Sequence, residues 1–134
     1  MIKVLLDTNI IISAMLNSQS VPNMAFQKAM NTPYRALVSE QNIEELRRVF
    51  DRKFPNKIGI FESFVAKTLP FVEIIPVPLS PHPDEDIIRD TNDRPILRAA
   101  IEAKVDIIVT GDKDFLESGL TAPQIMTAAE FVKP

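Results

Sequence analysis

Four acidic residues of this 134-residue chain lie where a parallel α/β sheet would bring them together. Asp7 and Asp112 each directly follow a short apolar run that reads as a buried strand, while Glu45 and Asp93 lie in or just before helical patterns. In an open parallel sheet, ligands bind outside the carboxyl ends of the strands. We therefore expect these four side chains to face one crevice.

Converging carboxylates repel each other strongly unless protons or cations neutralise them. Oxygen-only clusters suit hard divalent ions such as Mg²⁺ or Mn²⁺. The chain has no cysteine, which excludes thiolate ligands and thiol nucleophiles, and its single histidine, His82, makes a multi-histidine metal site improbable. The pattern predicts a metal-dependent phosphate chemistry.

Each acid also has a structural alternative. Asp7 is a possible helix cap, but Thr8 and Asn9 can cap as well, so we favour a functional role for Asp7. With about 100° per residue, Glu44 points roughly 150° away from the apolar side of its helix, into solvent. Glu45 points roughly 110° away, at the border of the core, and remains equally compatible with an ordinary surface glutamate.

Two further aspartates stand beside the other two candidates. Asp93 directly precedes a helix and is both a possible N-cap and a possible metal ligand, and Asp90 is a weaker candidate in the same loop. Asp112 is assigned to the site because it lies nearer the strand end than Asp114, which is either a supporting residue or a cap. The side chains of Thr110 and Asn9 are suited to bonding a phosphate or holding a carboxylate.

The composition is that of one globular domain, with 46% apolar and 25% charged residues. No apolar run is long enough to cross a membrane, and the start of the chain shows no signal peptide, so we expect a cytoplasmic protein. The net charge of −3 does not indicate a nucleic-acid binder. Basic residues do gather on one segment, as either a solvated helix face or a phosphate-guiding patch: Arg47, Arg48, Arg52, Lys53 and Lys57.

Strand and helix patterns alternate along the chain, which predicts a mostly parallel sheet covered by helices on both faces. The proline-rich segment 76–83 is expected to be an extended surface loop. The expected strands are 2–6, 34–38, 71–75, 106–109 and 124–126. The expected helices are 10–16 with Asn9 as cap, 22–30, 40–53 with Ser39 as cap, 58–69, 94–104, a turn over 112–119, and a last one opened by the capping box of Thr127 and Glu130.

Four segments together resemble the motifs of the PIN-domain nucleases, and more closely those of the VapC-like toxins of toxin–antitoxin pairs. The similarity extends over nearly the whole chain, in order and at the expected spacing. The segments are VLLDTNI (4–10), SEQNIEELRRVF (39–50), RDTNDRPILRAA (89–100) and IVTGDKDFL (108–116).

The resemblance implies a single PIN-like domain over residues 1–134, an α/β/α sandwich, and an Mg²⁺- or Mn²⁺-dependent endoribonuclease. It implies that Asp7, Asp93 and Asp112 hold the ions, that Glu45 completes the cluster or positions water, and that Asn9 and Thr110 organise the residues around them. Members commonly form homodimers, and the toxins are silenced by an antitoxin protein.

Other functions remain to be separated from this one. A phosphatase of the haloacid dehalogenase type needs an acid two positions after Asp7, where this chain has Asn9, and a receiver-like phosphoacceptor needs an acidic pair and a lysine that are not evident. The remaining alternatives are a nuclease of RNA processing or decay that has no antitoxin, and an RNA- or protein-binding module without catalysis.

Overall fold

The centre of the molecule is a five-stranded sheet with the order β3-β2-β1-β4-β5, in which every neighbouring pair is parallel. It is seen in a computed structural model that describes residues 1–134, apart from the side chain of Leu69. The strands are β1 (Ile2–Leu6), β2 (Tyr34–Ser39), β3 (Val72–Ile75), β4 (Ile107–Val109) and β5 (Gln124–Met126).

The order of the strands reverses at β1, because β2 and β3 add to one side of it and β4 and β5 to the other. The carboxyl ends of β1 and β4 thus form a topological switch point, where the connections leave in opposite directions. Val4, Leu5 and Leu6 of β1 are fully buried, as expected for a central strand covered on both faces.

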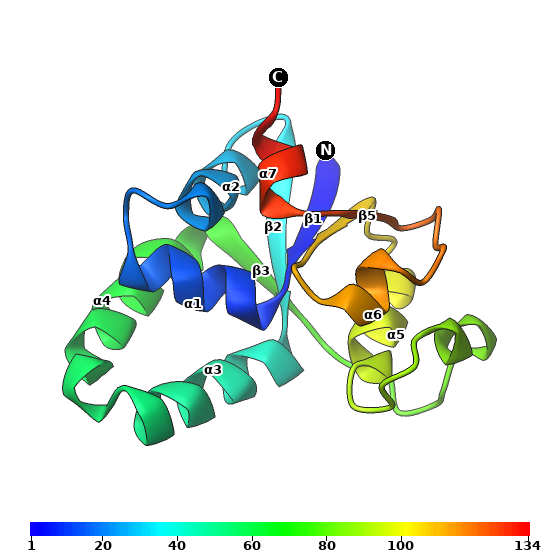
Figure 1. Ribbon diagram of the computed structural model, residues 1–134, viewed down its shortest axis with the longest axis horizontal. Coiled ribbons are helices and arrows are strands. Elements are labelled where there is room, and N and C mark those ends of the chain that lie inside the picture. Colours follow the sequence, from blue (N-terminus) through cyan, green and yellow to red (C-terminus); the bar gives the residue numbers. More distant parts are fainter.

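Seven α-helices among the described residues cover the two faces of the sheet (Figure 1). They are α1 (Thr8–Leu16), α2 (Val21–Ala29), α3 (Glu40–Lys53), α4 (Ile58–Thr68), α5 (Arg94–Glu102), α6 (Lys113–Leu116) and α7 (Ala128–Val132). Short 3₁₀ helices occur at η1 (Pro55–Lys57), η2 (Leu69–Phe71) and η3 (Pro83–Ile87).

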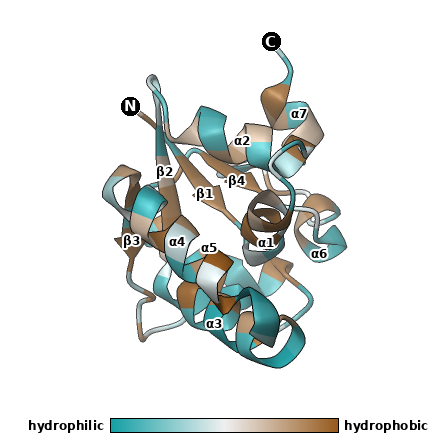
Figure 2. Ribbon diagram, turned by 90° about the vertical axis from the view of Figure 1, so that its left-hand side faces the viewer, coloured by the Kyte–Doolittle hydropathy of each residue, from teal (hydrophilic) through white to brown (hydrophobic). Residues whose placement is uncertain are grey.

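Successive residues of β1 face two separate hydrophobic cores. Val4 and Leu6 belong to the larger core, which packs against α1, α2, α3, α4 and α7, whereas Leu5 belongs to the core under α5 and α6. Apolar ribbon segments line the centre and polar ones the outside (Figure 2). The predicted α/β/α sandwich around a parallel sheet is confirmed.

Most predicted elements agree with the structure to within two residues. Helix α3 begins after its Ser39 cap, and the Thr127 capping box is present. Helix α5 ends at Glu102 instead of at residue 104, because Lys104 adopts a left-handed backbone with φ 57°.

The prediction that Asn9 caps the first helix was wrong. Asp7 has extended backbone angles and its side chain accepts a hydrogen bond from the Thr8 backbone, so α1 begins two residues earlier than expected. The strand exit leaves Asp7 as the last extended residue, which is the backbone state that an N-cap requires. Among the described residues, none of the helices combines the length and the apolar character that a membrane span requires.

Candidate metal centre

The carboxylates gather beyond the carboxyl ends of β1 and β4. Asp7 leaves β1, Asp112 follows β4 after two residues, Asp93 precedes α5, and Glu45 projects from α3. The charges of Glu45 and Asp112 both act on Asp7, and the charge of Asp7 acts on Asp93. The structure therefore brings the four predicted acids, from four parts of the chain, into one electrostatically linked cluster.

Asp7 is held by hydrogen bonds at both of its carboxylate oxygens. Oδ1 accepts from the Thr8 backbone at 2.8 Å and Oδ2 accepts from the Thr110 hydroxyl at 2.8 Å. Burial raises the pKa of Asp7 above its ordinary value, although the two hydrogen bonds lower it. The charges of Glu45 and Asp112 add smaller upward contributions. Asp7 is thus both the helix cap and part of the cluster, so the two readings of this residue do not exclude each other.

Thr110 links two of the acids. Its side chain is fully buried, its hydroxyl donates to Asp7, and the same oxygen accepts from the Asp112 backbone at 3.0 Å. The predicted contact between Thr110 and a carboxylate is confirmed. This threonine fixes the end of β4 relative to the end of β1.

Asp112 is the neighbouring residue that most affects the pKa of Asp93. Burial, a hydrogen bond to the Asp112 carboxyl and the charge of Asp112 together raise the pKa of Asp93 from 3.8 to about 7. Asp112 also caps α6, since its Oδ1 accepts from the Asp114 backbone at 2.9 Å. Asp93 occupies the cap position of α5 but makes no capping hydrogen bond, which leaves its carboxyl group available to a ligand.

Glu45 lies at the edge of the cluster, where its Oε2 accepts a hydrogen bond from the Thr8 hydroxyl at 2.9 Å. Its neighbour Glu44 is exposed whereas Glu45 is half-buried, as the helical geometry predicted. Glu45 is thus joined to the first turn of α1, directly beside Asp7.

A second, overlapping group of carboxylates was not predicted as a unit. Oxygens of Asp90, Asp93 and Asp114 all lie within 4.8 Å of one another, a spacing that a single cation would accommodate. Asp90 accepts from the Asn92 backbone at 2.9 Å, which shapes the turn into Asp93. The two groups share Asp93, so Asp90 and Asp114, ranked lower from the sequence, stand beside the predicted acids.

Asn9 is exposed and makes no side-chain hydrogen bond with the described residues. Its part in organising the acids stays a prediction. A different asparagine, Asn42, does contact the site: it is fully buried in α3 and its Nδ2 donates to the Leu6 carbonyl, one residue before Asp7, at 3.3 Å. Asn42 ties the helix of Glu45 to the strand of Asp7. Its only sequence signal is a polar residue one turn before Leu46, on the apolar side of the helix.

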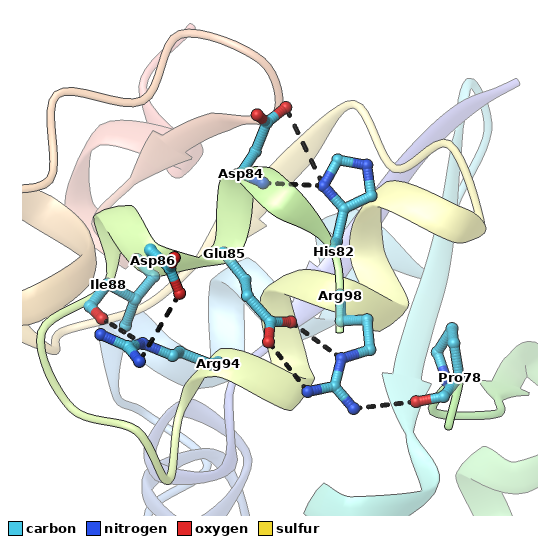
Figure 3. A network of polar contacts seen from close by, with 8 residues as sticks. All are labelled: Pro78, His82, Asp84, Glu85, Asp86, Ile88, Arg94 and Arg98. Atoms are coloured by element: carbon cyan, nitrogen blue, oxygen red, sulfur yellow. Dashed lines mark hydrogen bonds and ion pairs between the residues drawn. The ribbon is translucent and has the colours of Figure 1, made fainter. Parts of the chain in front are cut away.

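An ion pair between Arg98 and Glu85, which no local sequence pattern indicated, holds the loop leading to Asp93 (Figure 3). Arg98 donates from Nε and Nη2 to the two oxygens of Glu85 at 2.8 and 2.9 Å, and from Nη1 to the Pro78 carbonyl at 2.9 Å. Arg94 donates from Nε to the Ile88 carbonyl at 2.8 Å. The proline-rich segment is therefore fastened to α5.

The donor set fits a hard divalent cation. Every candidate ligand is a carboxylate oxygen, and burial together with the neighbouring carboxylates raises the pKa of Asp93 to about 7, so negative charge at this position is unfavourable without a cation. Such oxygen-rich sites favour Mg²⁺ or Mn²⁺ over the softer ions that prefer nitrogen and sulfur ligands.

Residues 3–114 match the family model of the PIN domain. The chain belongs to the PIN domain family. The matched region includes every acid of both carboxylate groups, from Asp7 to Asp114. Among curated proteins, this PIN domain is 28% identical over 116 residues to the uncharacterized protein MJ1680 of Methanocaldococcus jannaschii, covering 86% of this chain and 74% of that protein.

Two solved structures share the fold of this PIN domain. One is VapBC2 from Rickettsia felis bound to a DNA fragment from their promoter, with a TM-score of 0.69, 16% identity, and coverage of 94% of this chain and 98% of that chain. The other is DNA-bound VapBC from Salmonella typhimurium, with a TM-score of 0.68, 18% identity, and coverage of 96% and 99%.

Proposed function

We propose that this PIN domain is an Mg²⁺- or Mn²⁺-dependent endoribonuclease that hydrolyses phosphodiester bonds of RNA. The observation that carries the proposal is the cluster at the switch point, where burial and the neighbouring carboxylates, above all Asp112, raise the pKa of Asp93 to about 7. Crowded carboxylates lower the stability of a fold, and such perturbed groups are found together mainly at functional sites, including those that bind cations. The PIN domain match supports a nuclease.

In this proposal Asp7, Asp93 and Asp112 hold the divalent ion. Asp90 and Asp114, which have oxygens within 4.8 Å of an oxygen of Asp93, stand beside them. When bound, the ion supplies a more acidic water and stabilises charge on the phosphate and the leaving oxygen. Thr110 keeps Oδ2 of Asp7 in place through its hydroxyl. Glu45, held by Thr8, orients the attacking water or takes its proton.

We further propose that the chain, as a single domain over residues 1–134, is the cytoplasmic toxin of a toxin–antitoxin pair, a homodimer inhibited by an antitoxin protein. The shared fold with the chains in two VapBC structures supports this role. A PIN nuclease of RNA processing or decay would have the same site but no inhibitor. The two are separated by expressing the chain alone: a toxin arrests growth, and co-expression of an antitoxin restores it.

The test of catalysis is incubation of the purified protein with total RNA, with Mn²⁺ or Mg²⁺ and with EDTA, beside Asp7→Asn and Asp112→Asn. We expect the wild type to cut RNA only with metal, and both variants to lose about 100-fold or more of the activity. Asparagine retains the Oδ1 acceptor of each helix cap, so both variants should fold.

Circular dichroism and thermal unfolding provide the control for folding. Asp51→Asn, which neutralises an exposed acid on α3 outside the cluster, should cut RNA as the wild type does. RNA binding without cleavage under any metal condition would contradict the proposal and favour a binding module instead.

A further inference from the structure

The candidate site is strongly acidic, yet its proposed substrate is a polyanion. Asp7, Asp90, Asp93, Asp112 and Asp114 all lie at one edge of the sheet. Each phosphate of RNA also carries a negative charge, so a divalent ion alone leaves the approach of the strand opposed by the surrounding carboxylates. A cationic side chain at the rim would offset this repulsion.

Arg89 is the basic residue that contacts this group directly. Its Nε and Nη2 both donate to Oδ1 of Asp114, at 3.0 and 2.7 Å, and Nη2 lies 3.7 Å from an oxygen of Glu117. The side chain of Arg89 is nevertheless 74% exposed, whereas that of Asp114 is 22% exposed. The guanidinium group is thus held at a defined point on the rim and still faces solvent.

The bonds of Arg89 leave donors for a ligand. Both bonds to Asp114 come from one edge of the guanidinium group, and Nη1 makes no hydrogen bond with the described residues. Oδ2 of Asp114 likewise makes no side-chain hydrogen bond with the described residues, so the carboxylate is able to face Asp90 and Asp93 while its other oxygen holds the arginine. One aspartate connects the arginine to the acidic group.

The other two arginines of this region are committed elsewhere. Arg98 is bonded through all three of its nitrogens to Glu85 and to the Pro78 carbonyl. Arg94 donates to the Ile88 carbonyl and lies 3.6 Å from Asp86. Both fasten the loop, and neither presents an open guanidinium group to the site. Arg89 is therefore the arginine of this segment with the exposure to meet a substrate.

We propose that Arg89 binds a phosphate of the substrate RNA at the rim of the metal centre, and that Asp114 is the positioning residue that aims it. The inference rests on the proposed ribonuclease function and assigns a substrate contact within it. A guanidinium group with free N–H donors can form two parallel hydrogen bonds to the oxygens of a phosphate group, whereas a lysine ammonium attracts the phosphate only as a point charge. In this arrangement Asp93 faces the ion and Arg89 faces the RNA strand.

The test compares Arg89→Gln and Arg89→Lys with Arg35→Gln. Arg35 pairs with Glu73 at 3.0 Å near the amino end of β2, at the opposite edge of the sheet, and its side chain is 49% exposed. Arg35→Gln therefore removes the same charge and a comparable surface ion pair far from the site. The probe is a labelled single-stranded RNA oligonucleotide that the wild type cleaves with Mn²⁺.

We expect Arg89→Gln to raise KM about tenfold or more and to change kcat little. The hydrogen bond from the arginine to the phosphate would be equally strong in the bound substrate and in the transition state, so its loss weakens binding alone. The slope of log(kcat/KM) against log[salt] should become shallower by about 0.7, the amount for one phosphate of a single strand. Arg89→Lys should recover part of the loss in KM. Arg35→Gln should match the wild type, and the Mn²⁺-induced rise in Tm should persist in all three variants.

Equal KM values and salt slopes for Arg89→Gln and Arg35→Gln would overturn the assignment of Arg89 while leaving the ribonuclease proposal intact. A fall in kcat that accompanies a lost Mn²⁺ response would also overturn it, because Arg89 would then act only by ordering the metal ligands. A wild type that cuts no RNA with either metal would overturn both proposals together.

Discussion

Replacing Asp93 by asparagine should stabilise the metal-free protein at neutral pH. The folded state raises the pKa of Asp93 from 3.8 to about 7, mainly through burial and the neighbouring Asp112 carboxyl. Asparagine has nearly the same shape and carries no charge, and Asp93 makes no capping hydrogen bond that the change would remove. The substitution therefore isolates the electrostatic cost of this one carboxyl group.

The size of the effect follows from the same numbers. For a carboxyl group that water does not reach, a rise in pKa from 3.8 to about 7 means that ionising the group costs the folded state about 4 kcal/mol. Asp93 is only partly buried, so screening by solvent reduces this cost. The variant also loses a negative charge that favours the start of α5, which lowers its expected gain in stability by about 0.5 kcal/mol. We expect a net gain of about 1 to 2 kcal/mol at pH 8.

The gain should depend on pH in a defined direction. Because the folded state binds the proton more tightly than the unfolded state, the wild type loses stability as pH rises from about 4 through about 7. Below pH 4 the carboxyl group is protonated in both states and the penalty disappears. Urea unfolding of the wild type and Asp93→Asn in EDTA, at pH 4 and pH 8, measures both limits.

Asp51→Asn is the matched control, since it removes the same charge from an exposed position on α3. It should show little difference from the wild type at either pH. A gain for Asp93→Asn that is equal at pH 4 and pH 8, or a loss of stability at pH 8, would refute the reasoning that crowded carboxylates strain this site.

Three further outcomes test other parts of the structure. Thr110→Val removes the bonds to Asp7 and to the Asp112 backbone and should lower ribonuclease activity about 10- to 100-fold, while Thr110→Ser should retain most of it in the same assay. Arg98→Met leaves the buried Glu85 unpaired and should lower Tm by roughly 10 °C at pH 7, whereas the double variant with Glu85→Leu should recover much of this loss. Because the hydrogen bonds of Arg98 lower the pKa of Glu85, the stabilisation by the pair should decline progressively as pH falls from the ordinary value of 4.5 through the lower pKa of the folded state. Mn²⁺ should raise Tm more at pH 8 than at pH 6, because the ion competes with the proton on Asp93, whose pKa is raised to about 7, and an equal rise at both pH values would contradict this competition.

The helices and strands were largely predictable, because each depends on signals within a few residues. The Ser39 cap and the apolar spacing that follows it predicted α3 with the observed bounds, and the Thr127 capping box predicted α7. The start of α1 was misjudged because Asp7, Thr8 and Asn9 are all good caps. The choice among them depends on where the strand ends, which its hydrogen bonds to neighbouring strands decide.

The candidate acids were also identified in the sequence, but their grouping was not. From the sequence, Asp90 ranked below Asp93 in the same loop, and Asp114 ranked below Asp112 because Asp112 lies nearer the strand end. In the structure, the turn from Asp90 to Asp93 and the first residues of α6 approach each other, and Arg89 draws Asp114 to that side. Such a group depends on two loops meeting, which residue order does not encode locally.

By itself, the sequence determined the parallel α/β architecture, the elements and the set of acids that a cation would need, because apolar periodicity, caps and residue chemistry are local properties. Only the tertiary structure decided which carboxylates raise the pKa of Asp93, which oxygen of Asp7 accepts from Thr110, and that Arg98 pairs with Glu85. Those features depend on distances of a few ångströms between residues far apart in the chain. Packing of the two cores against the sheet fixes these distances, and they set the chemistry of the site.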